Sequence, residues 1–306
     1  MRKPNEKNRD YNYNFFFAQT AFADGLKVVM LGTGTPLMNP ERSGPGVAII
    51  SGGKSYIVDS GAGIVRRAME ASKTIPELQM GKLETVFLTH LHSDHTTGLS
   101  NMILAPWVLK NGRSKPLTLF GPPGTKHMAD NIINAYAEDI DLRINGSQPA
   151  NTEGYKVNTT EFSKSGIIFE DNNITVEAIK VPHGSWEHAY GYKFTEKQTG
   201  KTALVSGDTA YSEAIIKAAK GIDILIHEAI SDKALSKQST EWQIYHRSFH
   251  TLTSEIAEIG KKTKPRILLL YHQLYWDEED NSLAEEVSDA GYIGHVVSAN
   301  DLDIFE

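Results

Sequence analysis

Thr89-His90-Leu91-His92-Ser93-Asp94-His95 is the stretch of sequence that decides the fold of this 306-residue chain. It follows residues 85–88, an apolar run that predicts a buried strand. Three imidazoles and one carboxylate therefore lie within six residues at a strand end. The first two imidazoles can face one metal ion, and the carboxylate and third imidazole, carried around the following turn, can reach a second. Because imidazole and carboxylate are the ligands that zinc takes when thiolates are absent, the stretch predicts a metal site.

Three later side chains of the same chemistry also lie at the ends of predicted strands. They are His183 in Val181-Pro182-His183-Gly184, Asp208 in Ser206-Gly207-Asp208-Thr209, and His272 after residues 267–271. A histidine at a strand end is, taken alone, more often a hydrogen-bonded structural residue than a metal ligand. One cluster cannot complete two metal sites, however, so we expect these three to join the first stretch at one edge of the fold.

The rest of the sequence predicts short strands with few helices, and this pattern occurs in each half of the chain. The first half predicts strands over residues 26–31, 47–50, 55–58, 85–89 and 117–120, with one helix ending near 72 and another over 126–138. The second half predicts strands over residues 174–179, 189–194, 202–205, 222–226 and 267–271, with helices over 212–220 and 252–262. Residues 145–159 are expected to form a loop. This order predicts two sheets packed together with helices outside.

Composition and charge narrow the function classes. Hydrophobic residues make up 40% of the chain and charged residues 23%, which is ordinary for a globular protein and excludes a collagen-like or generally disordered chain. The 31 Lys and Arg against 38 Asp and Glu give a net charge of −7, so a broad nucleic-acid surface is not expected. The absence of Cys excludes disulfides, thiolate zinc sites and a cysteine nucleophile. No stretch approaches the run of about 20 apolar residues that a membrane span needs.

Residues 1–24 have the order of a secretory signal. Four basic side chains precede Phe15-Phe16-Phe17-Ala18, and Ala21-Phe22-Ala23 then forms a small-x-small cleavage site before Asp24. The apolar run is short, so a disordered, Asn-rich leader is the alternative. The sequence therefore favours a leader over 1–24 with periplasmic or secreted protein, or otherwise a cytoplasmic one, and a single hydrolase domain over 25–306.

Further motifs carry a resemblance to a known family. They are Leu31-Gly32-Thr33-Gly34-Thr35-Pro36, Val58-Asp59-Ser60-Gly61, Phe120-Gly121-Pro122, Gly207-Asp208-Thr209, His227-Glu228-Ala229 and His250. With the stretch from His90 to His95, they make residues 26–305 resemble the metallo-β-lactamase-fold hydrolases. The closest likeness is to the branch that contains RNase Z, the tRNA 3′ endonuclease, and the alkyl- and arylsulfatase-like enzymes. Glu228 and His250 are the features that point to this branch.

The resemblance implies a four-layer αββα sandwich of the α/β class with a two-metal site at one edge. His90, His92 and His183 would hold one metal ion. Asp94, His95 and His272 would hold the other, and Asp208 would bridge the two. The implied cofactors are two Zn²⁺, with Mn²⁺ or Fe²⁺ as alternatives. A di-iron redox role is disfavoured because the flavodiiron relatives usually carry Glu at the position of His92. β-Lactamase activity is disfavoured because the true zinc β-lactamases lack the bridging Asp.

The implied reaction is attack by a metal-bound hydroxide on phosphorus or sulfur, in line with the leaving group. Asp94 would orient the water as well as bind metal. His250 would protonate the leaving oxygen, and Glu228 would fix the tautomer of that imidazole and raise its pKa. The alternative interpretation makes Glu228 an ordinary strand-end carboxylate and His250 a neighbour of the N-cap of the following helix.

The leading hypothesis is a dinuclear zinc hydrolase of small phosphate or sulfate esters, phosphodiesterase-like or arylsulfatase-like. An RNase Z-type endonuclease, a lactone or acyl hydrolase and a metal-binding scaffold without activity are the alternatives, although a scaffold would be free to lose ligands and none of the seven is missing. Residues 195–201 predict a tight hairpin with no room for the tRNA-clamping arm of RNase Z, so tRNA is not the expected partner unless another surface, such as residues 145–159, binds it. A homodimer is compatible with the sequence.

Aromatic side chains near the predicted metal ligands allow two interpretations. Trp107, Trp186, Tyr190 and Tyr192 could wall the site for an aromatic leaving group, or they could simply pack in the core and at its rim. The histidines without a nameable partner are interpreted as structural; these are His127, His188, His246 and His295.

Overall fold

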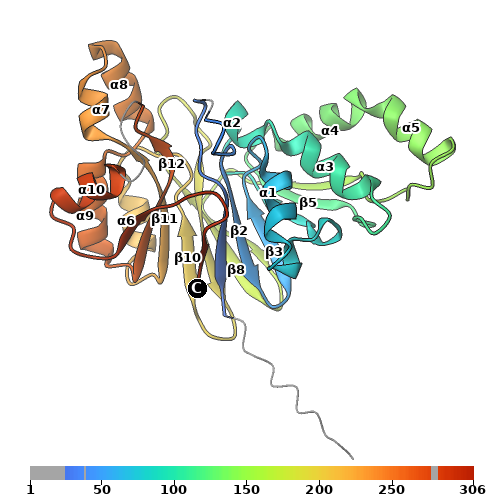
Figure 1. The fold of residues 1–306 in the computed structure, drawn as a ribbon, viewed down its shortest axis with the longest axis horizontal. Coiled ribbons are helices and arrows are strands. Elements are labelled where there is room, and N and C mark those ends of the chain that lie inside the picture. The colour runs from blue at the N-terminus through green and yellow to red at the C-terminus, as the bar shows by residue number, and fades with distance from the viewer. Residues whose placement is uncertain (1–24, 38, 277–281) are drawn as a thin grey trace, which may run out of the picture.

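The computed structural model describes residues 25–37, 39–276 and 282–306, so the leader predicted over 1–24 lies outside the described residues. Two seven-stranded sheets lie face to face, and helices cover the outer side of each (Figure 1). The predicted αββα sandwich is therefore confirmed. None of the helices in the described part of the chain has the length and apolar character needed to cross a bilayer.

The first sheet gathers most of the N-terminal half of the chain. Its order is β14 (Ile304–Phe305), β1 (Lys27–Gly32), β2 (Gly46–Ser51), β3 (Lys54–Val58), β4 (Thr85–Phe87), β5 (Leu117–Gly121) and β6 (Val157–Glu161). The pairings from β14 to β3 are antiparallel and those from β3 to β6 are parallel.

The second sheet repeats this order of pairing. Its strands run β7 (Gly166–Glu170), β8 (Ile174–Lys180), β9 (Tyr190–Glu196), β10 (Thr202–Val205), β11 (Ile224–Ile230), β12 (Ile267–Leu274) and β13 (Val296–Ser298). The pairings from β7 to β10 are antiparallel and those from β10 to β13 are parallel.

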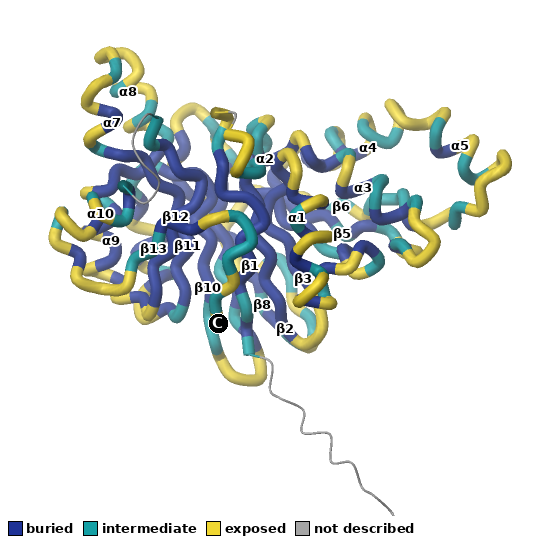
Figure 2. Tube along the Cα trace, viewed as in Figure 1, coloured by how far each residue is buried: buried dark blue, intermediate teal, exposed yellow. Residues whose placement is uncertain are grey.

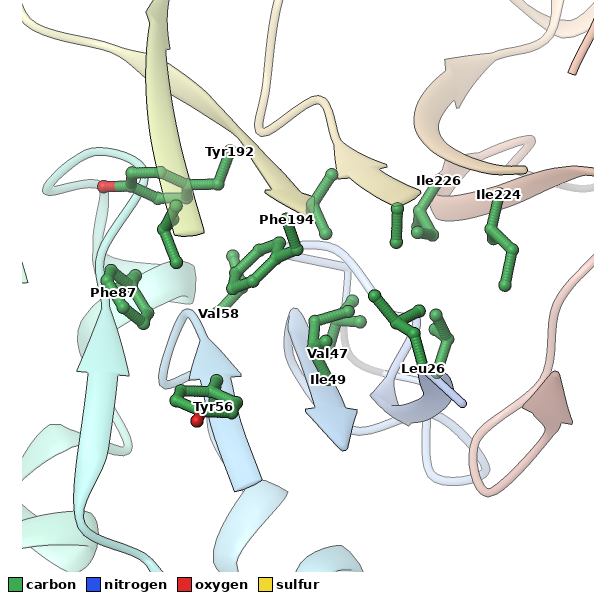
Figure 3. Packing of buried hydrophobic residues seen from close by; sticks show 14 of the residues in the cluster. Leu26, Val47, Ile49, Tyr56, Val58, Phe87, Tyr192, Phe194, Ile224 and Ile226 are labelled. Atoms are coloured by element: carbon green, nitrogen blue, oxygen red, sulfur yellow. The ribbon is translucent and has the colours of Figure 1, made fainter. Parts of the chain in front are cut away.

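Three apolar layers hold the sandwich together. Between the sheets, Phe87 packs against Phe120 with ring centroids 5.0 Å apart, and Phe194 approaches the same ring edge-on (Figure 3). The tube in Figure 2 shows that the strands are buried along most of their length. Burying one such side chain stabilises the fold by roughly 1.5–3 kcal/mol. Alternate residues of a strand face the core, and a shift by one residue would turn these side chains outward, so their burial fixes the register of both sheets.

The two outer layers are helical. On the first sheet lie α1 (Ile64–Ala71), α3 (Leu99–Val108) and α4 (Thr125–Ala135), with the short 3₁₀ turns η1 (Pro76–Leu78) and η2 (Met80–Lys82). On the second sheet lie α6 (Glu213–Ala218), α9 (Thr253–Thr263) and α10 (Ser282–Asp289). Two helical segments project further from the sandwich: α5 (Ala137–Asn145) after α4, and the pair α7 (Asp232–Ser236) and α8 (Thr240–Phe249) (Figure 1).

Most predicted strands are found within a few residues, but several elements were not predicted. The additional helices are α2, α3, α5, α7, α8 and α10, and the additional strands are β7, β13 and β14. Strand β6 begins at Val157, inside the loop predicted over 145–159, and its side chains are half-buried or exposed. An edge strand of this kind shows no apolar run, because only one of its faces meets the core.

The hairpin predicted over 195–201 is confirmed. Strand β9 ends at Glu196 and β10 begins at Thr202. The Glu196 carboxylate accepts hydrogen bonds from the amides of Gln198 and Thr199 at 2.7 and 2.6 Å, which closes the turn. No extended arm leaves the sheet at this described connection.

Candidate functional site

All seven predicted metal ligands come together at one edge of the sandwich. The parallel strands of both sheets end at this edge, where α/β folds place their ligands. His90 follows β4, and the short helix α2 (Ser93–Thr96) begins directly after His92 and carries Asp94 and His95. From the second half come His183 after β8, Asp208 after β10, and His272 in β12.

His272 is aimed at the site by a β-bulge. The pairing of β11 with β12 passes from Glu228 opposite Tyr271 to Ala229 opposite Gln273, which leaves His272 as the extra residue. Its φ of 44° lies in the left-handed region, which a residue other than glycine adopts only at some cost. The bulge turns the imidazole out of the ladder toward the carboxylates.

The first cluster consists of His90, His92, His183 and Asp208, whose donor atoms lie within 4.8 Å of one another. Nδ1 of His92 lies 2.9 Å from Nε2 of His90 and 3.1 Å from Nε2 of His183. Neutral imidazoles that point lone pairs at a common centre repel one another, whereas a cation at that centre is coordinated by all three.

The second cluster consists of Asp94, His95 and His272, and Asp208 reaches into it as well. Nε2 of His272 lies 3.1 Å from Oδ2 of Asp94 and 3.4 Å from Oδ2 of Asp208. Nε2 of His95 and Oδ1 of Asp208, 3.3 Å apart, are buried and form no hydrogen bond. Buried polar atoms left in this way are costly unless an ion binds them, so the residues fit two divalent cations that share Asp208.

Outer contacts hold the ligands in place. Nδ1 of His95 lies 2.8 Å from Oδ2 of Asp59, and Oδ1 of Asp59 accepts a hydrogen bond from the amide of Thr89 at 2.8 Å. Nδ1 of His183 donates to the carbonyl oxygen of Phe249 at 2.8 Å. Such contacts select the ring nitrogen that would face a metal ion. Asp59 was quoted in a motif but given no role; its position directly after a strand was the signal that could have identified it.

Electrostatics divides the imidazoles into two groups. Burial lowers the pKa of His90 well below its ordinary value and that of His183 to about 4. Burial also acts on His95 and His272, but the surrounding carboxylates together outweigh it and raise the pKa of both: Asp208 and Asp94 act on each, and Asp59 acts on His95 as well. The first cluster therefore offers unprotonated nitrogen, whereas metal binding at the second must displace protons.

Glu228 and His250 form a buried pair beside the second cluster. Oε2 of Glu228 lies 3.2 Å from Nδ1 of His250, and Oε1 accepts from the amide of Thr251 at 2.7 Å. The expectation that Glu228 raises the pKa of His250 is wrong: burial lowers the pKa of His250 to about 4 and raises that of Glu228. Both shifts have the same cause: surroundings of low polarity disfavour the charged form of each group. His250 also ends α8 as its C-cap, a helix absent from the sequence-based prediction.

A cavity of about 470 Å³ opens above the two clusters. Its lining residues are Pro36, Leu37, His92, Ser93, Asp94, Asp208, Gln238, Trp242, Tyr245, His246, His250, His272, Leu274 and Trp276. Of these, Asp94, Asp208, His92, His250 and His272 belong to the predicted site, and the aromatic wall comes from elsewhere in the chain.

Of the two interpretations of the aromatic residues, the structure supports packing. Trp107, Tyr190 and Tyr192 are buried in the interior and do not wall the site. Trp186 lies at the edge of the site, where its indole N–H donates to Nε2 of His92. Trp242, Tyr245 and Trp276 line the cavity instead, together with His246, which had been interpreted as structural. His127, His188 and His295 do not line it.

Comparisons with known proteins agree with this arrangement. Residues 55–273 match the family described as the β-lactamase superfamily domain. A ribonuclease Z from Mycobacterium bovis (strain BCG / Pasteur 1173P2) is 25% identical over 248 residues, which cover 81% of this chain and 85% of that protein. The metallo-β-lactamase fold protein YhfI from Bacillus subtilis superposes with a TM-score of 0.68 at 19% identity, over 92% of this chain and 98% of that one. The short form of human tRNase Z superposes with a TM-score of 0.67 at 20% identity, over the same shares of the two chains.

Proposed function

The chain belongs to the metallo-β-lactamase superfamily and is a metal-dependent hydrolase of ester bonds, and from that premise we propose that it uses two zinc ions to cleave small phosphodiesters or sulfate esters. The observation that carries this proposal is Asp208 on the floor of one cavity, whose carboxylate belongs to the first cluster and lies 3.3 Å from Nε2 of His95 and 3.4 Å from Nε2 of His272 in the second. Two divalent ions bound there would supply Lewis acidity and lower the pKa of water. Mn²⁺ and Fe²⁺ are the alternatives to zinc.

The chain's own residues divide the remaining work. His90, His92 and His183 would hold one ion, Asp94, His95 and His272 would hold the other, and Asp208 would be shared by both. Asp94 would also accept a hydrogen bond from the attacking water and so orient it. The Glu228–His250 pair, 3.2 Å apart, would deliver a proton to the leaving oxygen. The cavity above them, at about 470 Å³, is the size of a small-molecule site.

Two features favour a small substrate over tRNA. The connection between β9 and β10 is a closed hairpin at residues 197–201, with no protruding arm. The net charge of −7 opposes the dense phosphate charge of RNA, which proteins usually meet with Lys and Arg. The second candidate is an RNase Z-type tRNA 3′ endonuclease, favoured by the ribonuclease Z relatives that match 81% of the chain. A lactone or acyl hydrolase is a third candidate, because the same ions would serve it.

A substrate panel separates these candidates. Purified zinc-loaded protein, beside an Asp208→Ala control, is assayed with an aryl phosphodiester, an aryl sulfate, a lactone and a 3′-extended precursor tRNA at low salt. We expect turnover of the phosphodiester or the sulfate, and little or none of the tRNA. Efficient cleavage after the discriminator nucleotide would overturn the small-substrate proposal and assign the endonuclease.

The leader over 1–24, its export and a homodimer remain proposals without support from the described residues. N-terminal sequencing of protein from the native host tests the leader. A chain that begins at Asp24 supports cleavage and export, and an intact Met1 contradicts them. Light scattering at several protein concentrations tests the homodimer, which a monomeric mass at every concentration would contradict.

A further inference from the structure

Helix α8 carries large aromatic side chains that have no role in the core. None of its ten residues, Thr240–Phe249, is buried, and Trp242 and Tyr245 are 55% and 41% exposed. Both line the cavity above the metal ligands. Core packing, which explains most large aromatic residues of this chain, does not explain these two, and exposed aromatic groups that border a pocket mark a ligand-binding surface.

The aromatic side chains of α8 are held in fixed positions. The ring of Trp242 stacks on that of His246 with centroids 5.6 Å apart and planes inclined by 27°. The ring of Tyr245 lies 4.6 Å from that of Phe249, at 31°. Phe249 in turn packs edge-on against His183 at 4.9 Å. A chain of ring contacts thus connects the wall to a metal ligand.

Gly184 makes room for this arrangement. A Cβ at this position would lie 2.1 Å from the ring of Phe249, so only glycine leaves space for that ring beside His183. The backbone of Gly184 also has φ of 51°, which glycine adopts without strain. The wall is therefore set at a constant distance from the ligand clusters.

The charge of the cavity indicates what the wall recognises. Among the described residues that line it there is no Lys or Arg. Charged contacts of the protein to a substrate are thus limited to the two carboxylates and whatever ions they hold. Two divalent ions against Asp94 and Asp208 would leave a small positive charge, enough for one anionic centre and not for several. Beyond that centre the lining offers chiefly apolar and aromatic contact, with Ser93, Gln238 and His246 as further polar side chains.

We propose that Trp242 and Tyr245 bind a flat aromatic group of the substrate, so that the enzyme prefers esters with one negative charge and an aryl or nucleoside moiety beside the phosphorus or sulfur. This inference rests on the proposed function for the identity of the ester and deepens it. The two side chains are specificity residues: they contact the substrate away from the bond that breaks, while the floor performs the chemistry.

The test compares two anions of equal charge, one with phenyl and one with methyl groups. Diphenylphosphinate and dimethylphosphinate each carry one charge and no ester bond, so their binding to zinc-loaded protein can be measured by calorimetry without turnover. We expect diphenylphosphinate to bind wild-type protein roughly 10- to 100-fold more tightly, the range typical of stacking on aromatic side chains. Trp242→Leu and Tyr245→Leu together should remove most of this preference by weakening the binding of diphenylphosphinate.

Two further variants control the measurement. Ile244→Ala removes another large side chain of α8, 67% exposed and outside the cavity lining, and should keep the full preference. The single variant Trp242→Phe, with Tyr245 intact, should keep most of the preference for the phenyl compound. An undiminished preference in the double Leu variant would overturn the inference. If wild-type protein hydrolyses no ester but shows this preference, the proposed function fails and the aromatic site stands.

Discussion

The ligands on the floor of the cavity lie at strand ends of two sheets, whereas the aromatic side chains of its wall lie mainly on one helix, α8, that projects from the sandwich (Figure 1). On the floor, His90, His95 and Asp208 are no more than 2% exposed, and outer contacts such as that of Asp59 fix them further. On the wall, Trp242 is more than half exposed and is placed by ring contacts within its own helix.

This difference teaches which part of the site can vary independently. A ligand on the floor cannot be changed without disturbing buried groups that depend on it, because each lost contact leaves another polar atom unpaired. A side chain that α8 contributes to the wall can be exchanged at little cost to folding, since no residue of this helix is fully buried. The floor therefore determines the reaction, and the wall determines which ester enters it. The experiments below test this division.

The largest effect is expected from Asp208→Ala, which removes the group common to both clusters. Activity should fall at least about 10³-fold, because charge stabilisation by bound metal is worth several kcal/mol. Metal analysis at saturating zinc should also show fewer than two ions per chain. Asp130→Ala, which removes an exposed carboxylate of α4 paired with Lys126, is the matched control and should change neither quantity. A fully active Asp208→Ala enzyme would refute the two-metal site.

His250→Ala should produce a loss that depends on the leaving group. Esters with poor leaving groups should lose about 10²- to 10⁴-fold in kcat, the usual worth of general acid help, and activated nitrophenyl esters much less. A plot of rate against leaving-group pKa measures this. His127→Ala, which removes an exposed imidazole of α4, serves as control. Equal losses for both kinds of ester would mean that His250 positions the substrate and donates no proton.

Asp59→Asn tests how far the floor depends on its outer contacts. The amide can still accept from Thr89 but no longer supports His95 with a charge, so zinc affinity should fall about 10- to 100-fold. Competition with a chelator of known affinity gives the value. Asp223→Asn alters a carboxylate that accepts from the amide of Thr202 at 2.8 Å, away from the site, and should keep wild-type affinity. Unchanged zinc binding in Asp59→Asn would show that the His95 contact is only structural.

The smallest effect should come from loosening the wall alone. Ser239 caps α8 by accepting from the amide of Trp242, and Ser212 caps the packed helix α6 by accepting from the amide of Ile215. Loss of such a cap costs about 1 kcal/mol, or up to about 5-fold in an equilibrium. Ser239→Ala should therefore raise KM for aromatic esters by that factor and leave Tm and zinc content unchanged. Ser212→Ala should lower Tm and spare KM; the reverse pattern would contradict the division between floor and wall.

The floor could be predicted from the sequence because its ligands follow apolar strands. An apolar run such as residues 85–88 can be recognised without a structure, and polar groups directly after it must lie at the edge of the sheet. The register of β12 could not be predicted in the same way. The bulge that orients His272 depends on the register between β11 and β12, which the sequence of neither strand determines alone.

The wall could not be predicted for a different reason. Tyr190 and Tyr192 lie close to His183 in the chain, but alternate residues of a strand share one face, and on β9 that face is the core. The sequence of α8 does place Trp242, Tyr245 and Phe249 at helical spacing, yet none of the residues of this helix is fully buried. Such spacing predicts an amphipathic helix, but it does not tell whether the aromatic face meets the core or lines a cavity.

The matched order of pairing in the two sheets bears on the ancestry of the molecule. Strands β1 to β6 have two antiparallel pairings followed by three parallel ones, and strands β7 to β13 have three followed by three, a near match that tandem duplication of a shorter gene would explain. The first copy would have contributed four ligands and the second three, so catalysis could begin only once the copies met. Fragments separated within residues 162–165, between β6 and β7, should likewise be inert alone and recover hydrolysis on mixing. Strand β14, which returns from the C-terminus to pair with β1, would join one fragment to the other.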